Sequence, residues 1–237
     1  MKYIDKNTKS LIVVKAEHVL SNSKEYNSNP EIRNIIRDIY SNCCAYCECN
    51  PEEGAFFQID HFYPKSKKKY FGIRKDIRNL HYSCPACNTL KGVKNPDIIM
   101  SPNYYINSYN IWSMSCRNKI ENELYYVGHL LFSSNKLMTI NRGEETIKMF
   151  NLNNQIYPYN RTYLVESRLR CFSDVYMLLD AIYELLKNYN VKNKKALDIL
   201  ILLLLRYTDA SQHFSTMILH NFGSYIIKIL QIYWKLR

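Results

Sequence analysis

The sequence has no apolar run long enough to cross a membrane, which takes about 20 consecutive apolar residues. Its longest apolar stretch, residues 199–205, follows Asp198 and is ended by Arg206. The first ten residues, MKYIDKNTKS, also lack the apolar core of a secretory signal. We therefore expect a cytoplasmic protein without a membrane partner.

Acidic residues are in the minority. Among 237 residues, 32 are lysine or arginine and 21 are aspartate or glutamate, a formal net charge of +11. The excess favours a polyanionic partner, with nucleic acid ahead of a membrane surface. An AT-rich coding sequence would also enrich lysine, so the position of the charge carries more information than its total.

The cysteines point to a metal site. Eight cysteines without an export signal argue against a disulfide scaffold, because a reducing compartment keeps thiols free. Cys44 and Cys47 form one C-x-x-C knuckle, and Cys84 and Cys87 form a second. Two knuckles supply four thiolates for one tetrahedral zinc ion. Such an ion keeps no open coordination position, so its role is structural.

The other four cysteines lack this spacing. Cys43 and Cys49 flank the first knuckle and stay open as alternative ligands, so the choice of Cys44 rests on the two-residue spacing alone. Cys116 and Cys171 have no partner motif, and we interpret them as structural thiols.

Local patterns predict the elements around the knuckles. Asn29 can cap a helix with Pro30 at its first position, and apolar residues then recur on one face as far as Tyr40. Residues 55–62 and 79–83 are typical of strands, and residues 85–91 of a short helix. Residues 1–28 form an N-terminal arm, expected to be irregular apart from a short strand at 11–14. The arrangement is helix, strand, long loop, strand and helix.

The rest of the chain is predicted to be mainly helical. Residues 123–132 indicate a hairpin, 144–150 a short helix, and 196–207 and 214–236 two longer helices. A further helix carries apolar residues at alternating steps of four and three, the period of a coiled-coil seam. These residues are Val165, Leu169, Phe172, Tyr176, Leu179, Tyr183 and Leu186. We interpret the seam as an intramolecular core, with an intermolecular seam as the alternative.

Other residues stand in a fixed order relative to the knuckles. Asp60-His61 and Asn79-Leu80 lie between the two knuckles, and Asn88 directly follows the last cysteine, with Lys91 close behind. This order resembles the zinc-stapled HNH endonucleases of the ββα-metal class. The resemblance implies an α+β fold: a ββα-metal core with a four-cysteine zinc site at residues 29–100, followed by a mainly α-helical region at 101–237.

The resemblance also implies roles for these residues. His61 would be the general base, and Asp60 and Asn88 would hold a catalytic divalent ion, Mg²⁺ or Mn²⁺, which accepts such hard oxygen ligands. Asn79 would brace the loop and orient the base, and Lys91 would contact phosphate. The implied activity is metal-dependent cleavage of phosphodiester bonds in DNA.

A basic loop separates the two expected strands. Its cationic residues are Lys65, Lys67, Lys68, Lys69, Arg74, Lys75 and Arg78. Asp76 alone opposes them, so we expect salt-dependent phosphate binding without base reading. Tyr70 and Phe71 either pack inside the fold or stack on an unpaired base.

Several further residues have a plain structural interpretation. His81 follows Asn79 closely, but we expect it to be structural. Arg161, Arg168 and Arg170 on the long helix are expected to be solvated.

The wording DHFYPKS at residues 60–66 narrows the resemblance, together with the layout of the chain. Both are similar to the small HNH subunits of bacterial anti-phage systems, the Septu PtuB type and its retron-associated relatives. That resemblance implies an ATPase partner docked on the helical region. Two alternatives stay open: a zinc-ribbon module that binds nucleic acid without catalysis, and a stand-alone restriction or homing nuclease. The target, the trigger and the oligomeric state are open as well.

Overall fold

The computed structural model of the chain describes residues 1, 4, 6, 10–23, 29–50, 57–103, 105–106, 112–113, 120, 123–134, 141–155 and 160–236. None of the helices described in these ranges is both long and apolar enough to span a bilayer.

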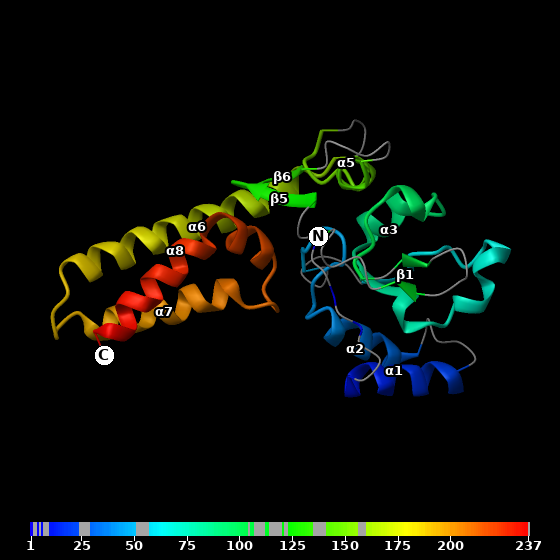
Figure 1. The fold of residues 1–237 in the computed structure, drawn as a ribbon, viewed down its shortest axis with the longest axis horizontal. Coiled ribbons are helices and arrows are strands. Elements are labelled where there is room, and N and C mark those ends of the chain that lie inside the picture. The colour runs from blue at the N-terminus through cyan, green and yellow to red at the C-terminus, as the bar shows by residue number, and fades with distance from the viewer. Residues whose placement is uncertain are drawn as a thin grey trace.

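The molecule joins a mixed part, which begins with the N-terminal helices, to a bundle of three long helices, and the hairpin at residues 124–133 lies against the bundle (Figure 1). In chain order the elements are α1 (Leu11–Asn22), α2 (Pro30–Ile39), β1 (Gln58–His61), β2 (Leu80–Ser83), α3 (Pro85–Lys91), β3 (Tyr105–Ile106), β4 (Trp112–Ser113), β5 (Leu124–Val127), β6 (Leu130–Ser133), α5 (Arg142–Met149), α6 (Thr162–Lys187), α7 (Lys194–Thr208) and α8 (Ser215–Lys235). The predicted α+β class and the helical C-terminal region are confirmed.

The predicted helix after residue 29 is confirmed as α2. The Asn29 side chain accepts hydrogen bonds from the backbone N–H groups of Glu31, at 2.9 Å, and Ile32, at 3.3 Å. Pro30 occupies the first helical position, where its missing N–H would have no partner. The buried residues Ile32, Ile35 and Ile36 form the apolar face that the spacing predicts.

The strand predicted at residues 11–14 is wrong, because this segment begins α1. Val13, Ala16 and Leu20 are buried on one side of the helix, and α1 packs against α2. The four consecutive apolar residues at the start are typical of a strand, whereas the helical spacing becomes visible only with Ala16 and Leu20, in the mostly polar stretch that follows. Packing against α2 therefore decides the conformation of the segment.

The strand, loop, strand and helix that follow the first knuckle are confirmed as β1, β2 and α3. The strands are antiparallel, with Asp60 opposite His81 and His61 opposite Leu80. Residues 55 and 56 of the first predicted strand lie outside the described residues. The Cys84 side chain caps α3 by accepting from the Cys87 N–H at 3.4 Å, so the second knuckle is also the start of the helix.

The predicted hairpin and the short helix after it are confirmed as β5–β6 and α5. Leu124 pairs with Ser133, and Val127 with Leu130. Asn141 caps α5 by accepting from the N–H of Glu144 at 3.0 Å, so the helix begins two residues earlier than expected.

The three predicted long helices are confirmed, but the seam on α6 is wrong in its residues. The buried side chains of α6 are Leu164, Arg168, Cys171, Val175, Leu179 and Ile182. Of the predicted seam only Leu179 is buried, whereas Tyr176 and Tyr183 are 63% and 50% exposed. The helix carries two adjacent apolar stripes, and the buried one includes a charged arginine. Hydrophobic spacing alone therefore selected the wrong stripe.

Replacing the Asn29 cap tests how much it contributes to α2. We expect Asn29→Ala to lower the free energy of unfolding by about 1 kcal/mol, since two helix N–H groups lose their acceptor. Ser10→Ala is the matched control, because Ser10 precedes α1 without a side-chain cap bond. Urea unfolding measures both, and equal stabilities for the two variants would contradict the capping role.

Candidate functional site

Four cysteine side chains gather at one point of the fold. The sulfur atoms of Cys44, Cys47, Cys84 and Cys87 all lie within 4.8 Å of one another, and all four residues are buried. The first pair lies in the turn after α2, and the second at the start of α3. Four convergent thiols suit one tetrahedral metal ion. The Cys84 N–H also points to the Cys44 sulfur at 3.4 Å, which favours the thiolate form.

Of the two alternative ligands next to the first knuckle, Cys43 points away from the cluster and Cys49 lies beside it. The Cys43 sulfur faces the carbonyl oxygen of Ser211, at 3.7 Å, in the connection between α7 and α8. Cys49 is only half-buried, and its sulfur lies 3.1 Å from that of Cys47. Cys116 lies outside the described residues, and Cys171 is buried on α6. The structure brings together the four buried cysteines that the spacing selected, and it places the Cys49 sulfur beside them.

Arg161 lies beside the cysteine cluster, contrary to the prediction of a solvated side chain. It is 8% exposed, and its Nη1 donates to the Cys87 sulfur at 3.4 Å. Burial lowers its pKa, but the Cys87 and Cys47 thiolates raise it more, so the net direction is a rise. Four thiolates with one divalent ion carry a net charge of about −2. The guanidinium offsets part of that charge.

The other two arginines of this group differ from each other. Arg168 is also buried, contrary to the prediction, and its Nη1 donates to the Leu152 carbonyl at 2.7 Å. The rings of Tyr126 and Phe214 lie 5.3 and 5.8 Å from its guanidinium carbon. Arg170 is exposed, as expected.

Asp60, on β1, is buried and has two partners. The Tyr46 hydroxyl, from inside the first knuckle, donates to Oδ2. The Lys91 ammonium lies 2.9 Å from Oδ1 and also donates to the His61 carbonyl at 2.6 Å. Lys91 is only 1% exposed, so the structure places it inside the fold and not at a surface where phosphate binds.

His61 is the residue next to Asp60 on β1. Its Nε2 lies 3.1 Å from the carbonyl oxygen of Arg74, which can only accept. Nε2 therefore carries the proton, and the lone pair is on Nδ1. Burial lowers the pKa of His61 to about 4, although the Asp60 charge acts in the opposite direction. The imidazole is neutral at neutral pH and can accept a proton.

Asn79 joins the two ends of the loop beside His61. Its Oδ1 accepts from the Tyr63 N–H at 2.8 Å, and its Nδ2 donates to the carbonyls of Tyr63 and Ile73 at 3.1 and 3.3 Å. The side chain is fully buried. These bonds are those that a loop-bracing role requires.

Asn88 projects from α3 toward β1. Its Nδ2 donates to the Gln58 side-chain oxygen at 2.5 Å. Gln58 lies two residues before Asp60 on β1, so the two side chains share one face of the strand. The amide and the carboxylate are oxygen ligands of the kind that Mg²⁺ accepts. However, both Asp60 oxygens already have partners, and one of these partners is a cation. The residues suit a divalent ion in chemistry, and in this conformation the Lys91 ammonium is the cation in contact with Asp60.

The basic loop presents only part of its charge to solvent. Exposed cations of the loop are Lys65, Lys68, Lys69 and Arg74. Arg78 instead pairs with Asp76 at 2.7 Å, and Lys75 donates to the Ser23 carbonyl at 2.6 Å. The ring of Tyr70 packs inside, whereas Phe71 is 57% exposed and lies under the Arg74 guanidinium. The two aromatic residues thus differ.

His81 is buried on β2 with a local partner. Its Nδ1 shares a hydrogen bond with the Tyr40 hydroxyl, and burial lowers its pKa well below the usual value. A neutral ring with an internal partner agrees with the structural interpretation.

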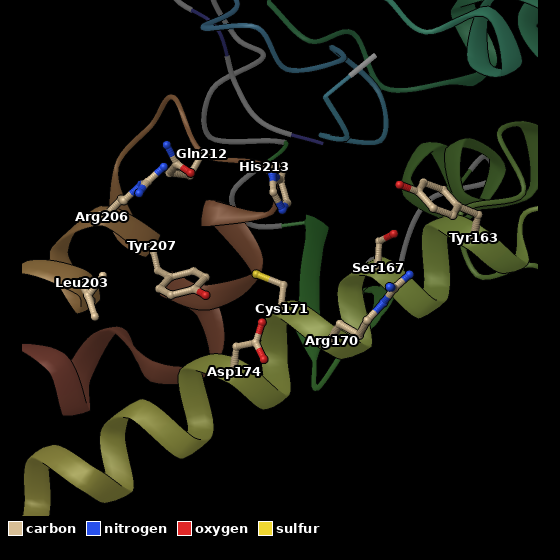
Figure 2. Close-up of a pocket in the computed structure, with 10 residues that line it drawn as sticks. All are labelled: Tyr163, Ser167, Arg170, Cys171, Asp174, Leu203, Arg206, Tyr207, Gln212 and His213. Carbon is tan, nitrogen blue, oxygen red and sulfur yellow. The ribbon is translucent and has the colours of Figure 1, made fainter. Parts of the chain in front are cut away.

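The cavity of 510 Å³ in Figure 2 lies elsewhere, between α6, α7 and the connection to α8. Arg170 and Arg206 stand on opposite sides of it, and Asp174 and Tyr207 lie between them. A second groove of similar size lies along α6 and α8. None of the residues assigned to catalysis or metal binding lines either one.

Two comparisons bear on this geometry. Residues 44–94 match the family described as HNH endonuclease. The chain is similar to the Septu protein PtuB of Bacillus thuringiensis, with 26% identity over 171 residues. That match covers 65% of this chain and 64% of the relative, so it spans slightly less than two thirds of the relative's length. The matched family segment contains both knuckles and every residue from Asp60 to Lys91.

Exchanging the cysteines one at a time tests the metal site. Cys44→Ser should release the bound metal and lower the melting temperature of the protein, because binding energy at a structural site is folding energy. Cys43→Ser should retain the metal, since that sulfur faces the Ser211 carbonyl. Elemental analysis and thermal unfolding measure both. A folded, metal-replete Cys44→Ser protein would remove Cys44 from the ligand set.

Proposed function

We propose that residues 44–94 are the catalytic domain of a metal-dependent HNH endonuclease that cleaves phosphodiester bonds in DNA. One observation carries the proposal: inside a segment that matches this family, a neutral buried imidazole and a carboxylate share a short strand beside four converging thiols. Hydrolysis of a phosphodiester needs a base for water and a cation for the charge that develops on phosphate.

The four-cysteine cluster, in this proposal, holds zinc. Thiolates select a soft or borderline ion, and a tetrahedral four-sulfur site is typical of structural zinc. Such a site has no coordination position left for substrate, so its role is structural. It connects the turn after α2 to the start of α3.

The protein's own residues perform the hydrolytic step as follows. His61 Nδ1 takes a proton from water as the water oxygen attacks phosphorus, and the bond from phosphorus to the leaving oxygen breaks. Asn79 fixes the loop that follows His61 and so the orientation of the ring. Asp60 and Asn88 would hold Mg²⁺ or Mn²⁺. An ion held there would supply positive charge to offset the charge that develops on the phosphate and the leaving oxygen.

The exposed lysines of the basic loop supply the DNA contacts in this proposal. The loop begins four residues after His61, so its charge lies close to this general base. Contacts of this kind bind any sequence, because they reach phosphates and not base edges.

The helical region is proposed as the docking surface for an ATPase partner in anti-phage defence. The similarity to a protein named for the Septu system supports the defence role. Exposed apolar side chains on all three long helices support docking; examples are Tyr176, Tyr183, Ile199, Leu202 and Tyr225. Tyr176, Tyr183 and Tyr225 line one groove along α6 and α8, and contiguous exposed apolar surface is typical of an interaction site. A partner would also restrain a nuclease that does not read sequence.

The Asp60–Lys91 pair favours one competing function, a zinc-stabilised module that binds nucleic acid without cleaving it. In that case the ammonium would be the permanent cation of the site, and no divalent ion would enter.

Plasmid cleavage separates these two functions. With Mg²⁺ or Mn²⁺, and with the co-purified partner where one is required, we expect the wild type to nick or linearise plasmid DNA. His61→Ala should lose at least about 100-fold in rate, since a general base contributes that much or more. His18→Ala, at an exposed position on α1, is the control and should match the wild type. Equal cleavage by the two variants would remove His61 from the mechanism.

The basic loop makes a prediction about salt. In the His61→Ala background, which binds without cleaving, Lys68→Ala/Lys69→Ala should reduce the slope of log affinity against log salt by about 0.9 for each phosphate that is no longer neutralised. The double variant Lys187→Ala/Lys195→Ala removes two exposed charges from the helical bundle as a control. Fluorescence anisotropy at several salt concentrations measures the slopes. An identical slope for the loop variant and its His61→Ala parent would place the DNA elsewhere.

A further inference from the structure

Lys91 is a buried cation at the centre of the candidate site. It is the last residue of α3, and its ammonium lies 2.9 Å from Asp60 Oδ1 and 2.6 Å from the His61 carbonyl. The two charged side chains are 1% and 5% exposed. An ion pair so far removed from water forms strong direct contacts, because little solvent competes for either charge.

The carboxylate of this pair is fixed on its other side as well. The Tyr46 hydroxyl donates to Oδ2, and Tyr46 stands between the two cysteines of the first knuckle. Both oxygens of Asp60 thus have a partner before any divalent ion arrives. An ammonium in contact with the carboxylate also repels a second cation at the same place.

The surroundings of Lys91 allow it to leave. Gly92 ends the helix with a φ of 51°, and the four residues that follow Lys91 in the chain, 92–95, are exposed. A long flexible side chain on the last turn of a short helix thus has a short path to solvent. Asp60 stays in place, because Tyr46 holds it from the opposite side.

We propose that Lys91 is the resident cation of Asp60 and that a divalent ion binds by displacing it. The inference rests on the proposed function, because it assigns to Lys91 the control of metal entry at that same site. The ammonium keeps the buried carboxylate neutralised while the site holds no metal, and it lowers the affinity for a divalent ion. Lys91 is a positioning residue, acting through Asp60.

Binding of Mn²⁺ to the zinc-loaded full-length protein, measured by electron paramagnetic resonance without DNA, tests this directly. Lys91→Met keeps the length of the side chain and removes its charge, so we expect Mn²⁺ to bind at least tenfold more tightly. Lys148→Met is the matched control and should bind as the wild type does, because Lys148 is exposed and pairs with Glu144 at 2.7 Å far from Asp60 in the chain. Adding Asp60→Asn to Lys91→Met should abolish the gain.

A second measurement uses the unmodified protein and so does not depend on how Lys91→Met folds. Amine acetylation followed by mass spectrometry should leave the buried Lys91 unreactive without Mn²⁺ and label it when Mn²⁺ is saturating. Unchanged or weaker Mn²⁺ binding by folded Lys91→Met would overturn the proposal. Equal acetylation of Lys91 with and without Mn²⁺ would overturn it too. Cleavage that depends on His61 is a separate readout, so the nuclease function can stand when this inference fails.

Discussion

The convergence of four thiols from two distant knuckles is the constraint on which the rest of the site depends. It brings the turn after α2 to the start of α3 across a separation of 40 residues between Cys44 and Cys84. Tyr46 is carried by the first knuckle and contacts Asp60. The helix that begins at the second knuckle carries Asn88 and Lys91. Every group around Asp60 is therefore positioned relative to the same cluster.

Local signals explain what the sequence predicts correctly about the fold. The Asn29 cap, the hairpin at β5–β6 and the long helices each depend on residues close together in the chain. The errors have a tertiary cause. The conformation of α1 is decided by its packing on α2, and the buried stripe of α6 by the shapes of α7 and α8. Neither partner surface can be read from the segment itself.

The candidate site shows the same division. The order of knuckles, Asp60-His61 and Asn79 is visible in the sequence, as are the strands and the helix that carry them. The pairing of Lys91 with Asp60 was missed, although strand alternation places Gln58 and Asp60 on one face and helix spacing aligns Asn88 with Lys91. The burial of Arg161 left no such signal, because its sulfur partner lies 74 residues away.

The Arg161 contact ties the beginning of the long helix α6 to the cysteine cluster. It stands at the beginning of α6, whose 26 residues extend roughly 39 Å at 1.5 Å per residue. A tilt of about 5° at that end would move the far end by about 3 Å. Since α6 also packs against α7 and α8, the Arg161 contact joins the cysteine cluster to the bundle as a whole.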